Sequence, residues 1–137
     1  MQARLDQQLL AFRCIVAVLA LIPIGAGAAG VVMGLSFPGL ELTTQNADAA
    51  SHFRFLSGIF LTMGLAYWSV AIQIGNYLHR FQFLAILTIA GGCARLLSLI
   101  VDGTPSVGHQ LGLAMELLVV PILLVWSGRL LRFQAQS

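Results

Sequence analysis

Two oppositely charged residues, Arg95 and Glu116, each stand inside an apolar stretch of this sequence. A polar turn at residues 102–105 separates the two stretches and leaves room only for an antiparallel helical hairpin. At about 1.5 Å of rise per residue, both side chains then lie roughly 10 Å below the same end of the hairpin. A guanidinium and a carboxylate can form two parallel charge-assisted hydrogen bonds, which lowers the cost of placing charge in an apolar region. We therefore expect Arg95 and Glu116 to pair.

Further ionisable residues fall at helical spacing around this expected pair. Asp102 lies seven residues after Arg95, and His109 lies seven residues before Glu116, so each shares a helix face with its neighbour. Arg54 opens an earlier apolar stretch and is a candidate partner for Asp102. We call these five residues the predicted polar cluster. Buried ion pairs can merely fix the register of helices, but charges inside a membrane also mark ligand or proton sites. Both interpretations remain open.

The composition is that of a membrane protein. The 137 residues are 58% hydrophobic and only 9% charged, with a mean hydropathy of +0.91. A water-soluble domain carries about 25% charged residues. Seven arginines and no lysine supply the basic charge, and they are scattered rather than clustered. We therefore expect the lipid bilayer, and no nucleic acid, as the partner.

Four apolar segments are long enough to cross a bilayer, and short turns join most of them. The sequence therefore predicts an all-α integral membrane domain over residues 1–137, a four-helix up-down-up-down bundle. The expected spans are approximately 14–36, 53–74, 81–101 and 109–130. A cleavable signal peptide is the alternative for the first segment. The apolar run continues past its small residues to Leu35, which favours a retained helix.

Small residues mark where helices can approach closely. Ala26, Gly30 and Gly34 recur every four residues and form a ridge along the first segment. The other predicted helix-packing positions are Gly58, Gly91 and Gly92.

The distribution of arginine predicts the orientation in the membrane. With four spans, five arginines fall at the end that carries both termini, and the loops at the opposite end contain no Lys or Arg. The positive-inside rule then places both termini in the cytoplasm. The aromatic belt expected at this end comprises Tyr67, Trp68, Tyr77 and Trp126.

The sequence offers no motif for catalysis or for a bound cofactor. Cys14 and Cys93 lie at different depths and form no CxxC pair, so we expect neither a disulfide nor a metal site. There is no nucleophile elbow, phosphate loop or pair of carboxylates at one depth. We therefore expect a protein that is not an enzyme and that uses no cofactor.

A spaced motif extends from Phe53 to Glu116. It reads FRFxxG, GGxxRxxSxxxDGxP and a later glutamate, carried by Phe53–Gly58, Gly91–Pro105 and Glu116. This pattern resembles a bacterial family of small four-helix membrane proteins known only as a domain of unknown function, and more distantly DoxX-like membrane proteins. The resemblance covers roughly residues 51–126. It implies a four-helix integral membrane fold and no catalytic residue.

These observations leave three hypotheses for the function. The first is an accessory or assembly subunit of a larger membrane complex, because almost no residues lie outside the expected spans. The second is a binder of a small lipophilic or anionic ligand, such as a lipid headgroup or a quinone, at the predicted polar cluster. The third, a proton pathway through Glu116, is the weakest because the inner half of the bundle lacks an ionisable relay.

Overall fold

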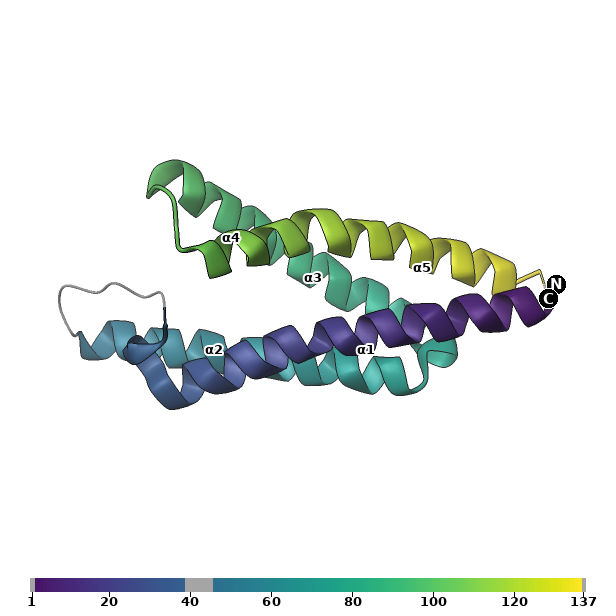
Figure 1. Cartoon of the computed structure of the whole chain (residues 1–137), viewed down its shortest axis with the longest axis horizontal. Helices are drawn as coiled ribbons and strands as arrows, with labels where there is room; N and C mark the ends of the chain where they lie inside the picture. Colours follow the sequence, from purple (N-terminus) through teal and green to yellow (C-terminus); the bar gives the residue numbers. More distant parts are fainter. Residues whose placement is uncertain (1, 39–45, 137) are drawn as a thin grey trace. The chain divides into compact units, whose positions relative to one another are not determined.

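The chain folds into long helices (Figure 1). The computed structural model describes residues 2–38 and 46–136, and this part of the chain contains no strand. The elements in order are α1 (Gln2–Met33), η1 (Gly34–Ser36), α2 (Ala47–Ile72), α3 (Ile74–Val101), α4 (Val107–Ala114), η2 (Met115–Val119) and α5 (Val120–Gln134). The all-α class expected from the sequence is therefore confirmed for these residues.

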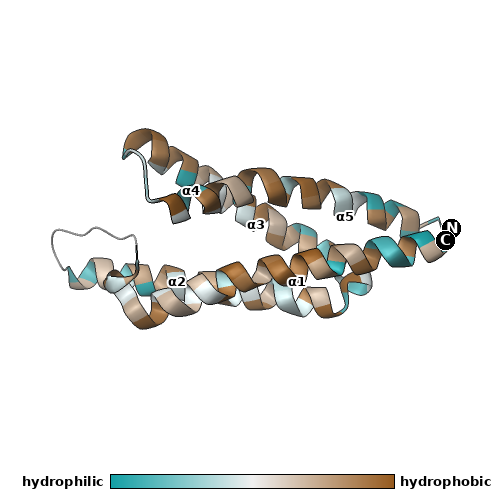
Figure 2. Cartoon of the chain, in the orientation of Figure 1, coloured by the Kyte–Doolittle hydropathy of each residue, from teal (hydrophilic) through white to brown (hydrophobic). Residues whose placement is uncertain are grey.

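Four helical segments are long and apolar enough to cross a membrane among the residues described. They are α1 with η1, α2, α3, and the continuous segment Val107–Gln134 formed by α4, η2 and α5. Figure 2 shows hydrophobic colour along the middle of these segments and hydrophilic colour near the chain ends. Each helix is longer than the span expected from hydropathy, since helical hydrogen bonding continues beyond the apolar residues. Insertion and the up-down order of all four helices remain predictions.

The chain divides into two compact units. The first, which we call the C-terminal hairpin, comprises Met1–Phe12 and Gln73–Ser137. The second, the N-terminal hairpin, comprises Arg13–Ile72. Helix α1 contributes its first residues to one unit and the remainder to the other. The organisation of the whole chain as a single domain stays a prediction.

In the N-terminal hairpin, α1 and α2 run antiparallel at close range. A Cβ atom added to Gly64 would lie 2.7 Å from the backbone nitrogen of Ile24. One added to Gly27 would lie 2.5 Å from the backbone nitrogen of Leu61. Residue numbers therefore rise along α1 as they fall along α2, and glycine is what lets the two backbones approach.

In the C-terminal hairpin, α3 runs antiparallel to the α4–η2–α5 segment. Gln82 in α3 contacts Ser127 in α5, while further along α3 Gly92 lies against η2. The start of α1 joins this unit through Phe12, whose fully buried ring contacts Phe81 and Trp126 edge-on at centroid distances of 4.9 and 5.1 Å. Aromatic pairs favour this edge-on arrangement because positive ring edges face negative ring faces.

The break between α2 and α3 lies nearer the N-terminus than expected. The sequence suggests a turn over residues 75–80, but the backbone leaves helical geometry at Gln73 (φ −130°, ψ 51°) and again at Tyr77 (φ −120°, ψ 22°). His79 and Arg80 consequently lie within helix α3, and the Arg80 guanidinium stands 4.3 Å from the centre of the Tyr77 ring. That cation–π contact holds the Arg80 side chain near the start of α3.

Candidate functional site

Arg95 and Glu116 form a two-point ion pair, as the sequence predicts. Arg95 Nε donates to Glu116 Oε2 at 3.0 Å, and Nη2 donates to Oε1 at 3.2 Å. The glutamate side chain is 11% exposed and the arginine side chain 31% exposed. Two parallel bonds to one carboxylate fix direction as well as distance. The pair therefore ties α3 to η2 in a defined register and neutralises both charges.

Glu116 stands in a segment whose helical geometry the sequence reading missed. Residues Met115–Val119 form a π-helical turn, in which the Val120 N–H donates to the Met115 carbonyl five residues back. Pro121 follows directly, has no N–H to donate, and crowds the preceding turn. Widening that turn by one residue relieves the crowding, and π-helical turns are frequent at functional sites. The available signal in the sequence was a proline five residues after a carboxylate inside an apolar stretch.

The extra residue also changes which side chains face α3. Each residue of an α-helix turns the face by about 100°. A turn that holds one residue more therefore resets the faces before and after it. Glu116 lies in this turn. The direction in which its side chain points, toward Arg95, therefore depends on the π-helical geometry.

Two glycines make room for the pair. A Cβ atom on Gly92 would lie 2.8 Å from Glu116 Cβ, and one on Gly112 would lie 3.9 Å from Arg95 Cζ. Larger residues at position 92 would push η2 away from α3. Gly91, by contrast, would present its Cβ to open space.

Asp102 and His109 turn to partners in their own segments. Ser98 Oγ donates to Asp102 Oδ2 at 2.8 Å, one turn apart on the last part of α3. Ser106 Oγ and His109 Nδ1 lie 2.9 Å apart at the start of α4. Gly103 allows the intervening loop to turn, with φ of +100°. Asp102 and His109 thus lie closer to the loop of the hairpin than the Arg95–Glu116 pair does. Each forms a hydrogen bond with a nearby serine rather than an ion pair.

Arg54 belongs to the N-terminal hairpin and caps a helix there. Its Nε donates to the Val31 carbonyl at 3.3 Å, near the end of α1. Gly34 follows with φ of +57°, and a Cβ on it would lie 2.6 Å from the Arg54 guanidinium carbon. A left-handed glycine and a cation at a helix C-terminus both satisfy the last carbonyls. The predicted pairing of Arg54 with Asp102 remains a prediction, because the two residues belong to different units.

The structure distributes the predicted packing glycines unevenly. A Cβ on Gly30 would collide with the Ser57 side chain, whereas a Cβ on Gly58 would meet no described atom within 4 Å. Ala26 is partly exposed. Gly27 and Gly64 make close contacts that the sequence reading overlooked. The sequence did contain a signal for Gly27. Gly27, Gly30 and Gly34 are separated by three and then four residues, and this spacing follows one helix face better than a strict four-residue step.

No group of three His, Cys, Asp or Glu side chains that could hold a metal ion occurs in residues 2–38 and 46–136. Both cysteines are free and exposed.

Comparison with known proteins gives a family but no individual relative. The family model described as Domain of unknown function (DUF4345) matches residues 11–127. Searches of curated proteins and of solved structures found no match. The matched region contains the N-terminal hairpin and most of the C-terminal hairpin, including the Arg95–Glu116 pair. The chain therefore belongs to the DUF4345 family of domains of unknown function.

Proposed function

We propose that this protein is a non-enzymatic integral membrane protein that serves as an accessory or assembly subunit of a larger membrane complex. The observation that carries the proposal is the extent of apolar helix surface that the chain leaves uncovered. Between 11% and 22% of the residues in each apolar helical window are buried within the chain. Lipid or other membrane helices must cover the rest.

The state of the polar pair supports a structural role. Glu116 and Arg95 each satisfy two hydrogen-bonding positions of the other, so neither charge stands ready to act on a substrate. A catalytic acid or base needs a free position facing the reacting atom. The pair instead defines how α3 meets η2, the use of buried ion pairs that is best attested.

The proposed location is the bacterial inner membrane with both termini in the cytoplasm. The arginine distribution supports this orientation, since Arg80, Arg129 and Arg132 lie near the start of α3 and the end of α5. A single cysteine placed at Gln136 or at Asp48 in a cysteine-free chain tests it. An impermeant thiol reagent applied to intact spheroplasts should label position 48 and spare position 136.

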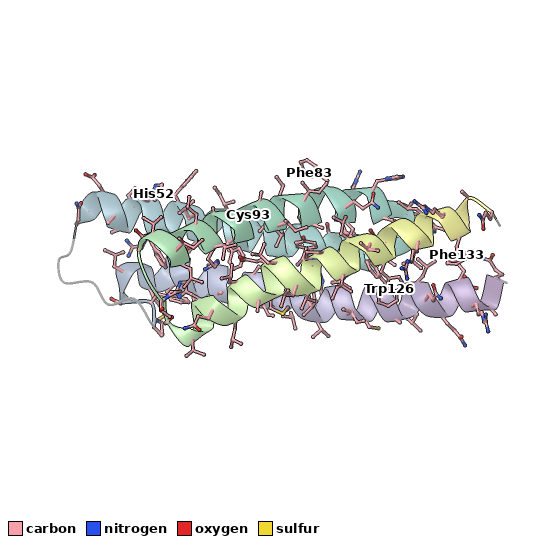
Figure 3. The ribbon with its side chains drawn as sticks, turned by 90° about the horizontal axis from the view of Figure 1, so that it is seen from above. His52, Phe83, Cys93, Trp126 and Phe133 are labelled. Atoms are coloured by element: carbon pink, nitrogen blue, oxygen red, sulfur yellow. The ribbon has the colours of Figure 1, made fainter. Side chains whose placement is uncertain are left out.

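Two phenylalanines of α3 provide a matched test of the subunit role. Phe83 is 63% exposed, and Figure 3 shows it projecting away from the ribbon, whereas Phe81 is 2% exposed. An aromatic photo-crosslinking amino acid at either position replaces a ring with a ring. Illumination of native membranes should join position 83 to a discrete second protein. Position 81 should give no such product.

The result that would contradict the proposal is equally specific. If position 83 yields only monomer and lipid adducts, that face of α3 contacts lipid. Repeating the experiment at Phe55, which is 63% exposed on α2, extends the test to the other hairpin. Monomer alone at both exposed positions would remove the accessory-subunit role.

A second candidate is a binder of a lipid headgroup or quinone at the predicted polar cluster. The observation that favours it is the 31% exposure of the Arg95 side chain, whose Nη1 is not used in the two bonds to Glu116. Native mass spectrometry of the wild type and of Arg95→Leu combined with Glu116→Leu compares a charged site with an uncharged one of similar size. Loss of a co-purified ligand in the double variant supports binding. Identical ligand-free spectra would exclude it.

A further inference from the structure

A second candidate site lies toward the opposite end of the C-terminal hairpin. A hollow of about 540 Å³ lies along one face of α5 and is open to the surroundings. Its lining residues are Pro121, Ile122, Val125, Trp126 and Arg129. They recur at helical spacing over about 12 Å, at roughly 1.5 Å of rise per residue. The hollow is therefore a groove parallel to the helix axis.

The groove changes character along its length. Ile122 and Val125 are 67% and 60% exposed and provide an apolar wall. Trp126 follows, then the exposed guanidinium of Arg129 close to the end of α5. Figure 2 shows the same change, from hydrophobic colour in the middle of α5 to hydrophilic colour near its C-terminal end. This pattern of an apolar wall followed by a cationic end matches an amphiphile that has one apolar end and one charged end.

The charge around Arg129 favours an anion. Arg80 lies at the same level of the hairpin, because Gln82 pairs with Ser127 and the two helices run antiparallel. Arg132 is one turn further along α5, and Arg4 lies on the segment of α1 that belongs to this unit. Asp6 is the single carboxylate described at this end of the unit. The excess of arginine attracts phosphate, and guanidinium binds phosphate oxygens in pairs.

Trp126 is held in place beside the groove. Phe12 contacts its ring edge-on, with an interplanar angle of 89°, and is itself fully buried. Tryptophan favours the boundary between acyl chains and headgroups. Figure 3 shows Trp126 on α5, before Phe133 near the end of the helix. A fixed indole at this level separates the apolar wall from the cationic end.

We infer that this groove binds one anionic phospholipid from the leaflet on the side of the termini. The phosphate lies against Arg129 and an acyl chain lies along Ile122 and Val125. Free phosphate would leave the apolar wall unused, and a zwitterionic lipid would gain less from the surrounding arginines. The inference rests on the proposed insertion in a bilayer but not on the accessory-subunit role.

Two arginines of α5 provide the test. Arg129→Gln removes the charge that lines the groove, and Arg132→Gln removes the same charge from the same helix outside it. Purified full-length protein is given equal amounts of phosphatidylglycerol and phosphatidylcholine in detergent, and retained lipid is read by native mass spectrometry. We expect the wild type to retain phosphatidylglycerol about fivefold better, since a surface arginine favours an anionic lipid by that order. Arg129→Gln should lose this preference and Arg132→Gln should keep it.

Competition distinguishes the two sources of phosphate. Millimolar inorganic phosphate should leave the retained phosphatidylglycerol unchanged, because the acyl chain contributes to binding. Displacement by phosphate would overturn the lipid assignment. Equal retention of both lipids by the wild type would overturn the proposed preference for an anionic lipid. An equal loss of that preference in both variants would overturn the site itself by showing general attraction to a basic surface.

Failure of the proposed function, either of bilayer insertion or of the accessory-subunit role, can be distinguished from failure of the lipid site. Protein that is extracted from membranes by alkaline carbonate would overturn bilayer insertion, and the lipid site with it. Integrated protein that retains phosphatidylglycerol but captures no partner at Phe83 or Phe55 would leave the lipid site standing. The same result would remove the accessory-subunit role.

Discussion

The two hairpins hold their helices together by different means. In the C-terminal hairpin, polar side chains join the helices at three levels. Gln134 Nε2 donates to the Gly75 carbonyl at 3.0 Å, Gln82 Nε2 donates to Ser127 Oγ at 3.2 Å, and Arg95 pairs with Glu116 at 3.0 Å. In the N-terminal hairpin, α1 and α2 meet through glycines, and the bond from Arg54 to the Val31 carbonyl adds a polar link near the end of α1.

The difference shows two solutions to one physical problem. Lipid tails are as apolar as leucine, so helices in a membrane gain little from hydrophobic burial against each other. Glycine lets backbones approach, and close packing then supplies dispersion attraction over a long contact. Polar pairs supply directional bonds that hold at a larger separation. We expect the N-terminal hairpin to respond to changes in side-chain volume and the C-terminal hairpin to changes in charge and hydrogen bonding.

The largest expected effect tests the ion pair. Glu116→Ala leaves Arg95 without its partner, and breaking a buried pair on one side costs about 3–5 kcal/mol. Replacing both residues by leucine removes both charges and keeps the volume, so the double variant should lie within about 1 kcal/mol of the wild type. Unfolding of purified protein by denaturant in detergent micelles measures both free energies. Equal destabilisation would mean that the pair does not hold α3 to η2.

The ion pair also shows how far sequence reasoning extends. Apolar segments on either side of a four-residue turn require a hairpin, and two opposite charges at one depth require each other, so Arg95 and Glu116 could be paired from spacing alone. Pro121 signals a disturbed turn near Glu116, but the sequence does not show that the turn is π-helical, because this geometry depends on how η2 accommodates Pro121 against α3. Asp102 and His109 share the faces expected of them, yet each finds a nearer serine, which face assignment alone does not reveal.

The second prediction tests the glycine contacts with two positions on α2. Gly64→Ala would place a Cβ against the backbone of Ile24, which cannot move cheaply, so we expect a loss of about 1–3 kcal/mol. Gly58→Ala meets open space and removes a flexible residue from a helix, so it should raise stability by up to about 1 kcal/mol. The same denaturant titration measures both. Changes of the same sign would show that glycine contacts do not hold this hairpin.

A smaller effect concerns the polar cap of the same hairpin. Arg54→Gln keeps a hydrogen-bond donor near the Val31 carbonyl but removes the charge at the C-terminus of α1. The expected loss is about 1 kcal/mol, the usual range for a cation at that end of a helix. Arg13→Gln serves as the control, because Arg13 is an exposed arginine in the first half of α1, far from the C-terminus of that helix. A similar loss in both variants would indicate an effect of net charge rather than capping.

The smallest effect is the coupling between Gln82 and Ser127. Ser127 is fully buried and also donates to the Leu124 carbonyl, so its oxygen can accept from Gln82 while its hydrogen is used within α5. Hydrogen bonds between membrane helices contribute about 0.6 kcal/mol on average in double-mutant cycles. Gln82→Leu, Ser127→Ala and the double variant should give a coupling energy of that size.

This last measurement decides whether the polar links act together. If the coupling stays near 0.6 kcal/mol when Arg95 and Glu116 are both leucine, each link contributes independently along the hairpin. If it falls to zero there, the ion pair sets the separation of α3 and α5 at which Gln82 can reach Ser127. The second result would assign the register of the whole C-terminal hairpin to one pair near its end. The glycine-packed hairpin has no equivalent, because its close contacts are spread from Gly27 to Gly34 along α1.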